Sequence, residues 1–171
     1  MLVLANLTPF VMLQETPLVQ QMFFRRASTA DIGEVRELTR TAYAKWIPLI
    51  GREPMPMTAD YTKAVAEHII ELYEQNGRLI GLIEVIPTPS HLLVENIAVL
   101  PAMQGNGIGD QLLRHAETVA RSLQLPELRL YTNSAFATNL SFYRRRGFQE
   151  FRREPLATGG EVVHMKKPLK P

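Results

Sequence analysis

Three glycines stand at alternate positions in the segment QGNGIGD, at Gly105, Gly107 and Gly109. The apolar run VENIAVLP precedes them and an amphipathic run follows. A strand that turns through glycines into a helix presents backbone N–H groups, to which the helix N-terminus adds roughly half a positive charge. Glycine lets an anion approach these amides without basic side chains. We therefore expect segment 104–109 to hold a pyrophosphate.

The glycine spacing by itself has low specificity, because glycines also serve tight turns that bind nothing. It is not the dinucleotide fingerprint G-x-G-x-x-G, and no Gly-Lys-Ser/Thr of a nucleotide-binding loop follows it. Further motifs are needed to choose the ligand.

The elements that must position this loop follow from periodicity and turn residues. Asn76-Gly77 favours a type I′ hairpin turn and Thr29 favours a helix N-terminus. Three prolines and one glycine interrupt segment 46–57. The expected strands are 22–28, 68–75, 78–87, 91–101, 127–132, 148–154 and 161–167; the expected helices are 29–42, 58–67, 107–123 and 137–146. This order predicts a mixed α/β sheet in a single domain, residues 22–171. Residues 1–21 are expected to be a loosely ordered N-terminal extension.

Composition narrows the function classes. The 171 residues are 46% hydrophobic with a formal net charge of +2, too small an excess to argue for nucleic acid. No cysteine is present, which excludes thiolate nucleophiles and disulfides, and His68, His91, His115 and His164 lack metal-ligand spacing. No apolar run approaches the ~18 residues that a membrane span needs. We expect a cytoplasmic protein with no metal, membrane or nucleic-acid partner.

Two motifs resemble those of a known family. Gln104 to Gly109 matches the Gln/Arg-x-x-Gly-x-Gly/Ala loop of the GNAT superfamily of acyl-CoA-dependent N-acyltransferases, and NIAVLP is similar to its central strand. Downstream, ATNLSFYRRRGF resembles its second signature, with Asn139, Tyr143, Gly147 and Phe148 at the matching places. The resemblance spans residues 22 to about 167, and it implies a mostly antiparallel, twisted sheet flanked by helices.

The resemblance also implies the cofactor and its contacts. Acetyl-CoA would be the co-substrate, with its pantetheine arm along the central strand and the N–H of Val99 or a neighbour polarising the thioester carbonyl. The acceptor amine would attack directly, so that no enzyme nucleophile is needed. The expected cofactor contacts are Ile97, Ala98, Val99, Gln104, Gly105, Asn106, Gly107, Ile108, Gly109, Asn139 and Tyr143.

The same family pattern makes Tyr143 the general acid for the departing thiolate. Asn139 lies four residues earlier, on the same helix face. The alternative for Tyr143 is a core aromatic whose hydroxyl is satisfied. Glu95 is the favoured general base, against the alternative of a solvent-facing charge, and Glu84 and Tyr131 are weaker candidates.

Segment 42–57 corresponds to a wall of the acceptor site in this family. Tyr43 and Trp46 are expected to line an apolar pocket, and Arg52 is expected to bind a carboxylate. The alternative is a covering loop. Arg144, Arg145 and Arg146 are either cofactor-phosphate contacts or a solvated helix end.

The sequence therefore predicts an N-acetyltransferase that acts on a primary amine of a small molecule. Three alternatives remain: a non-catalytic acyl-CoA sensor, an acetyltransferase of protein or peptide amines, and a nucleic-acid binder that uses the arginines. The last hairpin leaves a sheet edge with which a second copy could pair to form a homodimer.

Overall fold

The computed structural model of the chain describes residues 22–170, so the expectation for residues 1–21 lies outside the described residues. A seven-stranded sheet has the order β1-β2-β3-β4-β5-β7-β6. Its strands are β1 (Met22–Arg26), β2 (Ile69–Gln75), β3 (Arg78–Pro87), β4 (Leu92–Val99), β5 (Glu127–Asn133), β6 (Gln149–Pro155) and β7 (Glu161–Pro168). Neighbours pair antiparallel except β4 and β5, which confirms the mixed, mostly antiparallel sheet.

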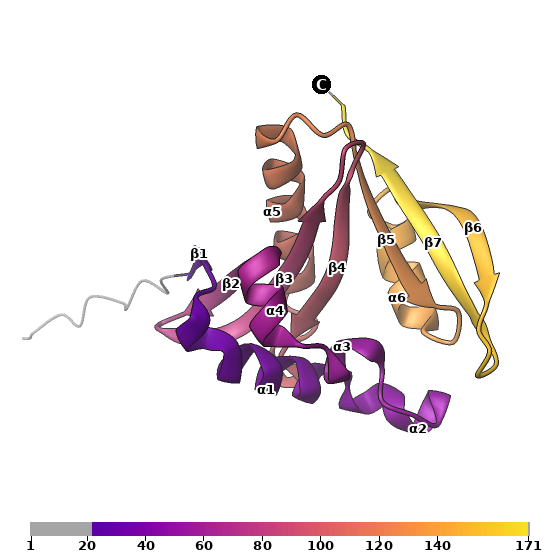
Figure 1. Cartoon of the computed structure of the whole chain (residues 1–171), viewed down its shortest axis with the longest axis horizontal. Helices are drawn as coiled ribbons and strands as arrows, with labels where there is room; N and C mark the ends of the chain where they lie inside the picture. The colour runs from indigo at the N-terminus through magenta and orange to yellow at the C-terminus, as the bar shows by residue number, and fades with distance from the viewer. Residues whose placement is uncertain (1–21, 171) are drawn as a thin grey trace, which may run out of the picture.

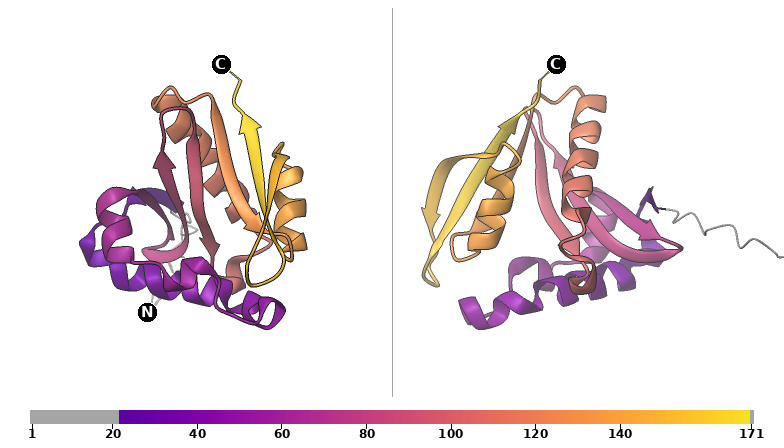
Figure 2. Two further views of the ribbon diagram at one scale, coloured as in Figure 1. Left: turned by 45° about the vertical axis from the view of Figure 1, so that its right-hand side comes forward. Right: turned by 180° about the vertical axis from the view of Figure 1, so that it is seen from behind.

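Helices cover both faces of this sheet (Figures 1 and 2). They are α1 (Ile32–Tyr43), α2 (Ile47–Ile50), α3 (Met55–Thr58), α4 (Tyr61–Glu67), α5 (Ile108–Ser122) and α6 (Ala137–Arg144), with 3-10 turns η1 (Thr29–Asp31), η2 (Ala44–Trp46) and η3 (Pro101–Met103). One core cluster joins α1 and α4 to Leu82 and Ala98, and another joins α5 to Ile83 and Val94. Leu82 and Ile83 are consecutive, as a strand buried on both faces requires.

The turn between β2 and β3 is of the predicted kind. Asn76 and Gly77 have φ values of 51° and 74°, the pair of positive angles that a type I′ turn needs. Two helix starts differ from the prediction. Ser28, not Thr29, caps the first turn in a capping box with Asp31, and Asp60 rather than Thr58 caps α4 by accepting from the Thr62 and Lys63 N–H groups. In each case a better-placed side-chain oxygen satisfies the first-turn amides.

Segment 46–57, expected to interrupt the helical pattern, contributes instead to three short helical turns, η2, α2 and α3. Pro48 and Pro56 stand in the first turns of α2 and α3, where a missing N–H costs nothing, and Gly51 ends α2 with a φ of 69°. The prolines therefore begin these turns rather than prevent them. The turns lie along the open end of the sheet below β4 and β5 in Figure 1.

Candidate functional site

Strands β4 and β5 stay together for only a short distance. They pair in parallel from Leu92–Val94 to Leu128–Leu130, and beyond these residues the two strands separate (Figure 1). Glu95 is an extra residue in β4, because Glu84 pairs with Asn96 while Val85 pairs with Val94. This bulge stands where the separation begins, and a bulge re-aims a side chain.

Beyond the bulge, the β4 backbone faces the gap at alternate residues. The Ile97 carbonyl accepts from the Tyr43 hydroxyl (3.3 Å) and the Val99 carbonyl accepts from Gln104 Nε2 (3.0 Å), so both carbonyls point away from β3. A strand residue directs its N–H and C=O to the same side. The N–H groups of Ile97 and Val99 therefore also lie on this edge, whereas those of Ala98 point toward β3.

The glycine loop 104–109 adopts the conformation that its sequence suggests. Gly105 and Gly107 have φ values of 84° and 76°, and a Cβ built at either would meet no atom within 4 Å. These two glycines are therefore needed for backbone conformation, and the space outside them is open. Glycine is needed at position 109 for a different reason, since a Cβ there would lie 3.0 Å from the Phe142 ring of α6.

Two cavities flank the separated strands. The first, of about 500 Å³, is enclosed by α3, α4, β4 and β5; the second, of about 450 Å³, lies over the glycine loop and α6. Four residues line both cavities, namely Tyr43, Ile97, Asn139 and Tyr143. The cavities thus meet beside the exposed edge of β4.

Tyr143 and Asn139 project from α6 at this junction. The Tyr143 ring packs against Phe142 and Phe148, with centroids 5.3 and 5.8 Å away. Burial raises the pKa of Tyr143 to about 12, so the phenol holds its proton at neutral pH. Among the residues that the structure describes, none makes a hydrogen bond to this hydroxyl, which leaves it free to meet a ligand.

Of the three residues expected to bind the acceptor in segment 42–57, two line the first cavity. Arg52 does so with no carboxylate partner in residues 22–170, and Tyr43 donates to Asn96 Oδ1 over 2.9 Å. Trp46, in the 3-10 turn η2, lines only the second cavity, which Tyr43 also lines, and stacks on Phe136 with ring centroids 4.3 Å apart.

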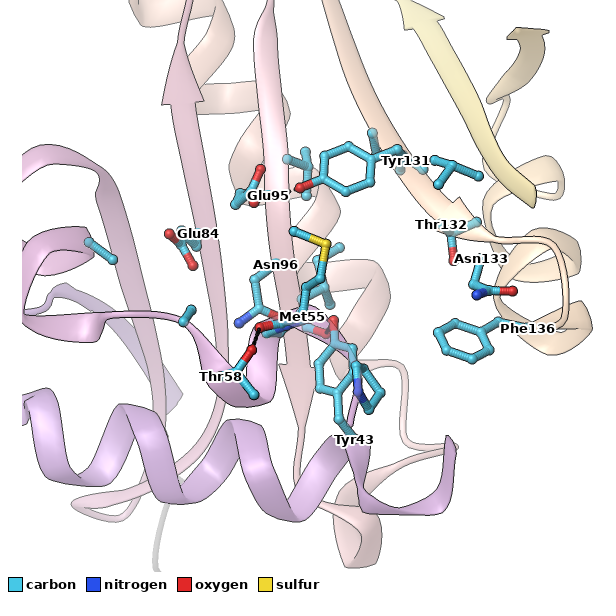
Figure 3. A pocket seen from close by; sticks show the side chains of 18 of the residues that line it. Tyr43, Met55, Thr58, Glu84, Glu95, Asn96, Tyr131, Thr132, Asn133 and Phe136 are labelled. Carbon is cyan, nitrogen blue, oxygen red and sulfur yellow. Dashed lines mark hydrogen bonds between the residues drawn. The ribbon is translucent and has the colours of Figure 1, made fainter. Parts of the chain in front are cut away.

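Four carboxylate residues line the first cavity, namely Asp60, Glu67, Glu84 and Glu95, and Figure 3 shows the last two. Glu95 accepts a hydrogen bond from the Tyr131 hydroxyl of β5 over 2.6 Å. Glu84 of β3 is only 4% exposed and lies 2.6 Å from His68 Nδ1. Burial is the main cause that raises the pKa of Glu84, and the contact with His68 opposes it.

Sequence reasoning missed His68, Tyr61 and Asn96 in this cavity. Asn96 is 3% exposed and its amide donates to the Tyr61 hydroxyl over 3.2 Å. A signal for His68 was present, because counting outward from the Asn76-Gly77 turn places residue 68 beside the strand that carries Glu84. An asparagine inside an apolar central strand was the corresponding signal for Asn96.

The three arginines at the C-terminal end of α6, Arg144 to Arg146, differ in what they contact. Arg146 donates to Asp110 over 2.8 Å and its guanidinium lies 3.7 Å from the Phe142 ring centroid, while Arg145 lines the second cavity without an ion pair in residues 22–170. Arg144 turns toward Glu150 at 3.5 Å. Arg145 and Arg146 therefore bring positive charge to the cavity that the glycine loop also lines.

No helix in residues 22–170 is long and apolar enough to cross a membrane. In the same residues, no three histidine, aspartate or glutamate side chains gather as a metal ion would require.

Comparisons with known proteins agree with one another. Residues 34–148 match the model of the Acetyltransferase (GNAT) family. An amino-acid acetyltransferase of Mycobacterium tuberculosis is 35% identical over 133 residues, which cover 77% of this chain and 71% of that protein.

Solved structures share the fold. A GNAT-family acetyltransferase of Desulfovibrio desulfuricans aligns with a TM-score of 0.73 at 21% identity, covering 86% of this chain and 99% of that one. The ribosomal-protein-S18-alanine N-acetyltransferase of Escherichia coli aligns at 0.72 and 19%, covering 88% and 96%. The PaiA N-acetyltransferase of Thermoplasma acidophilum, solved with coenzyme A, aligns at 0.72 and 19%, covering 87% and 99%.

Proposed function

Because this chain belongs to the GNAT acetyltransferase family, we propose that it moves an acetyl group from acetyl-CoA to the primary amine of a small molecule that also carries a carboxylate. The observation that carries this proposal is the meeting of two cavities at Tyr43, Ile97, Asn139 and Tyr143. A thioester in one cavity and an amine in the other would come together only there.

The second cavity is assigned to acetyl-CoA. The amides of Gln104, Gly105, Asn106, Gly107, Ile108 and Gly109 bind the pyrophosphate, as loop conformation and helix position favour. Pantetheine pairs with the free β4 edge through the backbone of Ile97 and Val99, while Ala98 between them is paired with β3, and Asn139 contacts pantetheine from α6. The Val99 N–H polarises the thioester carbonyl, a contact worth about 3 kcal/mol in the transition state.

Tyr143 protonates the sulfur that leaves. Its place at the junction, its retained proton and its unpartnered hydroxyl within the described chain support this role. Glu95 acts as a base on the acceptor nitrogen from the bulge of β4.

The first cavity receives the acceptor. Glu84 and Glu95 suit an ammonium group, and Arg52 suits a carboxylate elsewhere in the same molecule. The 35%-identical amino-acid acetyltransferase supports this substrate class. Tyr43 forms the wall beside the thioester, and Trp46 covers the acetyl-CoA side.

The test measures thiol release from acetyl-CoA with a panel of α-amino acids, their amides, simple alkylamines and short peptides. We expect turnover that is fastest with carboxylate-bearing amines. Preference for peptides would favour a protein acceptor instead. Tight acetyl-CoA binding without turnover on any amine would make the protein an acyl-CoA sensor and refute the proposal.

A further inference from the structure

Glu84 is a buried carboxylate that the function proposed above places near the acceptor ammonium but to which it gives no proton-transfer role. It lies on the face of β3 that α1 and α4 cover, and its side chain points into the acceptor cavity (Figure 3). Within residues 22–170, its ion-pair partner is His68, at 2.6 Å. His68 stands at the C-terminus of α4 and keeps a quarter of its side chain exposed. The pair therefore joins the cavity interior to the surface.

Among the described residues, the titratable groups that act on Glu84 are acidic or neutral apart from His68. Arg52 and Lys63 line the same cavity. Tyr61 faces it from α4, Tyr43 from α1, Glu95 from β4 and Tyr131 from β5. Burial and then the charge of Glu95 raise the pKa of Glu84, whereas His68 lowers it. A carboxylate whose proton affinity is raised in this way accepts a proton more readily at neutral pH than an exposed one does.

The reaction requires two proton transfers from one nitrogen. The acceptor enters as an ammonium ion with three protons and leaves as an amide with one. The first proton must depart before the lone pair can attack the thioester carbon. The second departs after the N–C bond has formed, as the C–S bond breaks. One proton replaces the one that Tyr143 gives to the sulfur, and the other goes to water.

The site contains two carboxylates in suitable places for these two transfers. Glu95 stands two residues before Ile97, beside the proposed thioester, and Tyr131 fixes it there. Glu84 stands one strand farther from the gap between β4 and β5, where His68 fixes it. An incoming ammonium can therefore meet Glu84 without displacing the groups at the reacting carbon.

We propose that the two carboxylates divide this work: Glu84, positioned by His68, takes the first proton from the acceptor ammonium, and Glu95 takes the second from the nitrogen after attack. The inference rests on the proposed acetyltransferase function. Glu84 returns its proton to water through the cavity when the product leaves, and His68 acts through Glu84 rather than on the substrate.

The experiment compares Glu84→Gln with the matched variant Glu95→Gln, using glycinamide and butylamine as acceptors. An α-amine has a pKa of about 7.7–8.0 and an alkylamine one of about 10.4, so that only the first is substantially deprotonated near neutrality. With butylamine at pH 7, we expect Glu84→Gln to lower kcat/KM by about 10²-fold. The loss should shrink with glycinamide and shrink further as the pH rises. Glu95→Gln should lose activity with both amines at every pH.

A second readout does not depend on turnover. Carbon NMR titration of the Glu84 carboxyl should show a raised pKa in the parent chain and a still higher one in His68→Asn, because the contact that lowers it is gone. A Glu84→Gln penalty that is equal for both amines and independent of pH would overturn the division of labour while leaving the acetyltransferase intact. A Glu84 that titrates like an exposed carboxyl would overturn it as well. Failure of the parent chain to acetylate either amine or any panel member would overturn both proposals.

Discussion

Tyr131 of β5 donates a hydrogen bond to Glu95 of β4 over 2.6 Å, just beyond the last residue pair that the two strands share. The contact bridges the strands where they separate. It also holds the Glu95 carboxylate at the wall of the first cavity. The residue that the sequence favoured as a general base is thus an oriented group, and its orientation depends on Tyr131, a weaker candidate for the same role.

Replacing Tyr131 by Phe should test this orientation. We expect kcat to fall about tenfold while the Kd of acetyl-CoA stays unchanged, because one charge-assisted hydrogen bond is lost away from the cofactor cavity. The matched measurement is the double variant with Glu95→Gln. If Tyr131 acts through Glu95, the second substitution should add little to the first. Fully additive losses would mean that Tyr131 has a role of its own.

The fold could be predicted because its signals are local. The Asn76-Gly77 turn and the helix expected over 107–123 each depend on neighbouring residues, and both appear where expected. The helical turns of 44–58 were missed because proline reads as a breaker unless its position within the turn is known. One such turn, η2, carries Trp46, which lines the second cavity rather than the first.

The site was predictable only in part, for a physical reason. The glycine loop is one continuous segment, so its conformation follows from its residues. The Glu84–His68 and Glu95–Tyr131 pairs join residues 16 and 36 positions apart, and they depend on strand register and on the bulge at Glu95. A one-residue shift of register would turn either carboxylate to the other face.

Replacing Gly107 by Val should abolish stabilisation by acetyl-CoA. A β-branched residue at a φ of 76° is strained by about 1–2 kcal/mol, and its side chain would project into the open space assigned to the pyrophosphate. Thermal unfolding with and without millimolar acetyl-CoA measures the loss. Gly33→Ala in α1 is the control, since its Cβ meets nothing and helix propensity improves. A Gly107→Val chain that is still stabilised as strongly as the parent would contradict the loop assignment.

Replacing Asp31 by Asn should weaken the fold in a pH-dependent way. Arg25, and then Ser28, hold the pKa of the buried Asp31 carboxyl well below its usual range. A depressed pKa contributes stability that is present above the unfolded value of about 3.9 and is lost as the pH falls. We expect a cost of about 1–2 kcal/mol at pH 7 that shrinks below pH 4. Urea unfolding across this range measures it.

The control for this prediction is Asp60→Asn, which retains a side-chain oxygen to cap α4. Asp60 accepts only from the Thr62 and Lys63 N–H groups and has no ion pair within residues 22–170. Its replacement should change the unfolding free energy by a few tenths of a kcal/mol. An Asp31→Asn penalty that stays constant from pH 7 to pH 3 would show that Asp31 contributes to the free energy of unfolding through packing and not through its charge.

Replacing Tyr143 by Phe should separate chemistry from stability. The hydroxyl has no hydrogen-bond partner in the described part of the chain, and the ring contacts with Phe142 and Phe148 survive the change. Stability and the Kd of acetyl-CoA should therefore stay near the parent values. If Tyr143 protonates the departing thiolate, kcat should fall toward the lower end of the ~10²–10⁴-fold range, since a thiolate leaves readily.

Tyr61→Phe supplies the opposite pattern. The Tyr61 hydroxyl donates to the Pro56 carbonyl over 2.8 Å and accepts from Asn96, so its removal leaves buried groups unpaired at a cost of about 1–3 kcal/mol. We would measure kcat, the Kd of acetyl-CoA and the melting temperature on both variants. The measurements compare the Tyr61 hydroxyl, which is hydrogen-bonded within the fold, with the Tyr143 hydroxyl, which has no such partner in the described residues. If Tyr143→Phe resembled Tyr61→Phe, with a lowered melting temperature and a normal kcat, Tyr143 would belong to the core and another group would have to protonate the sulfur.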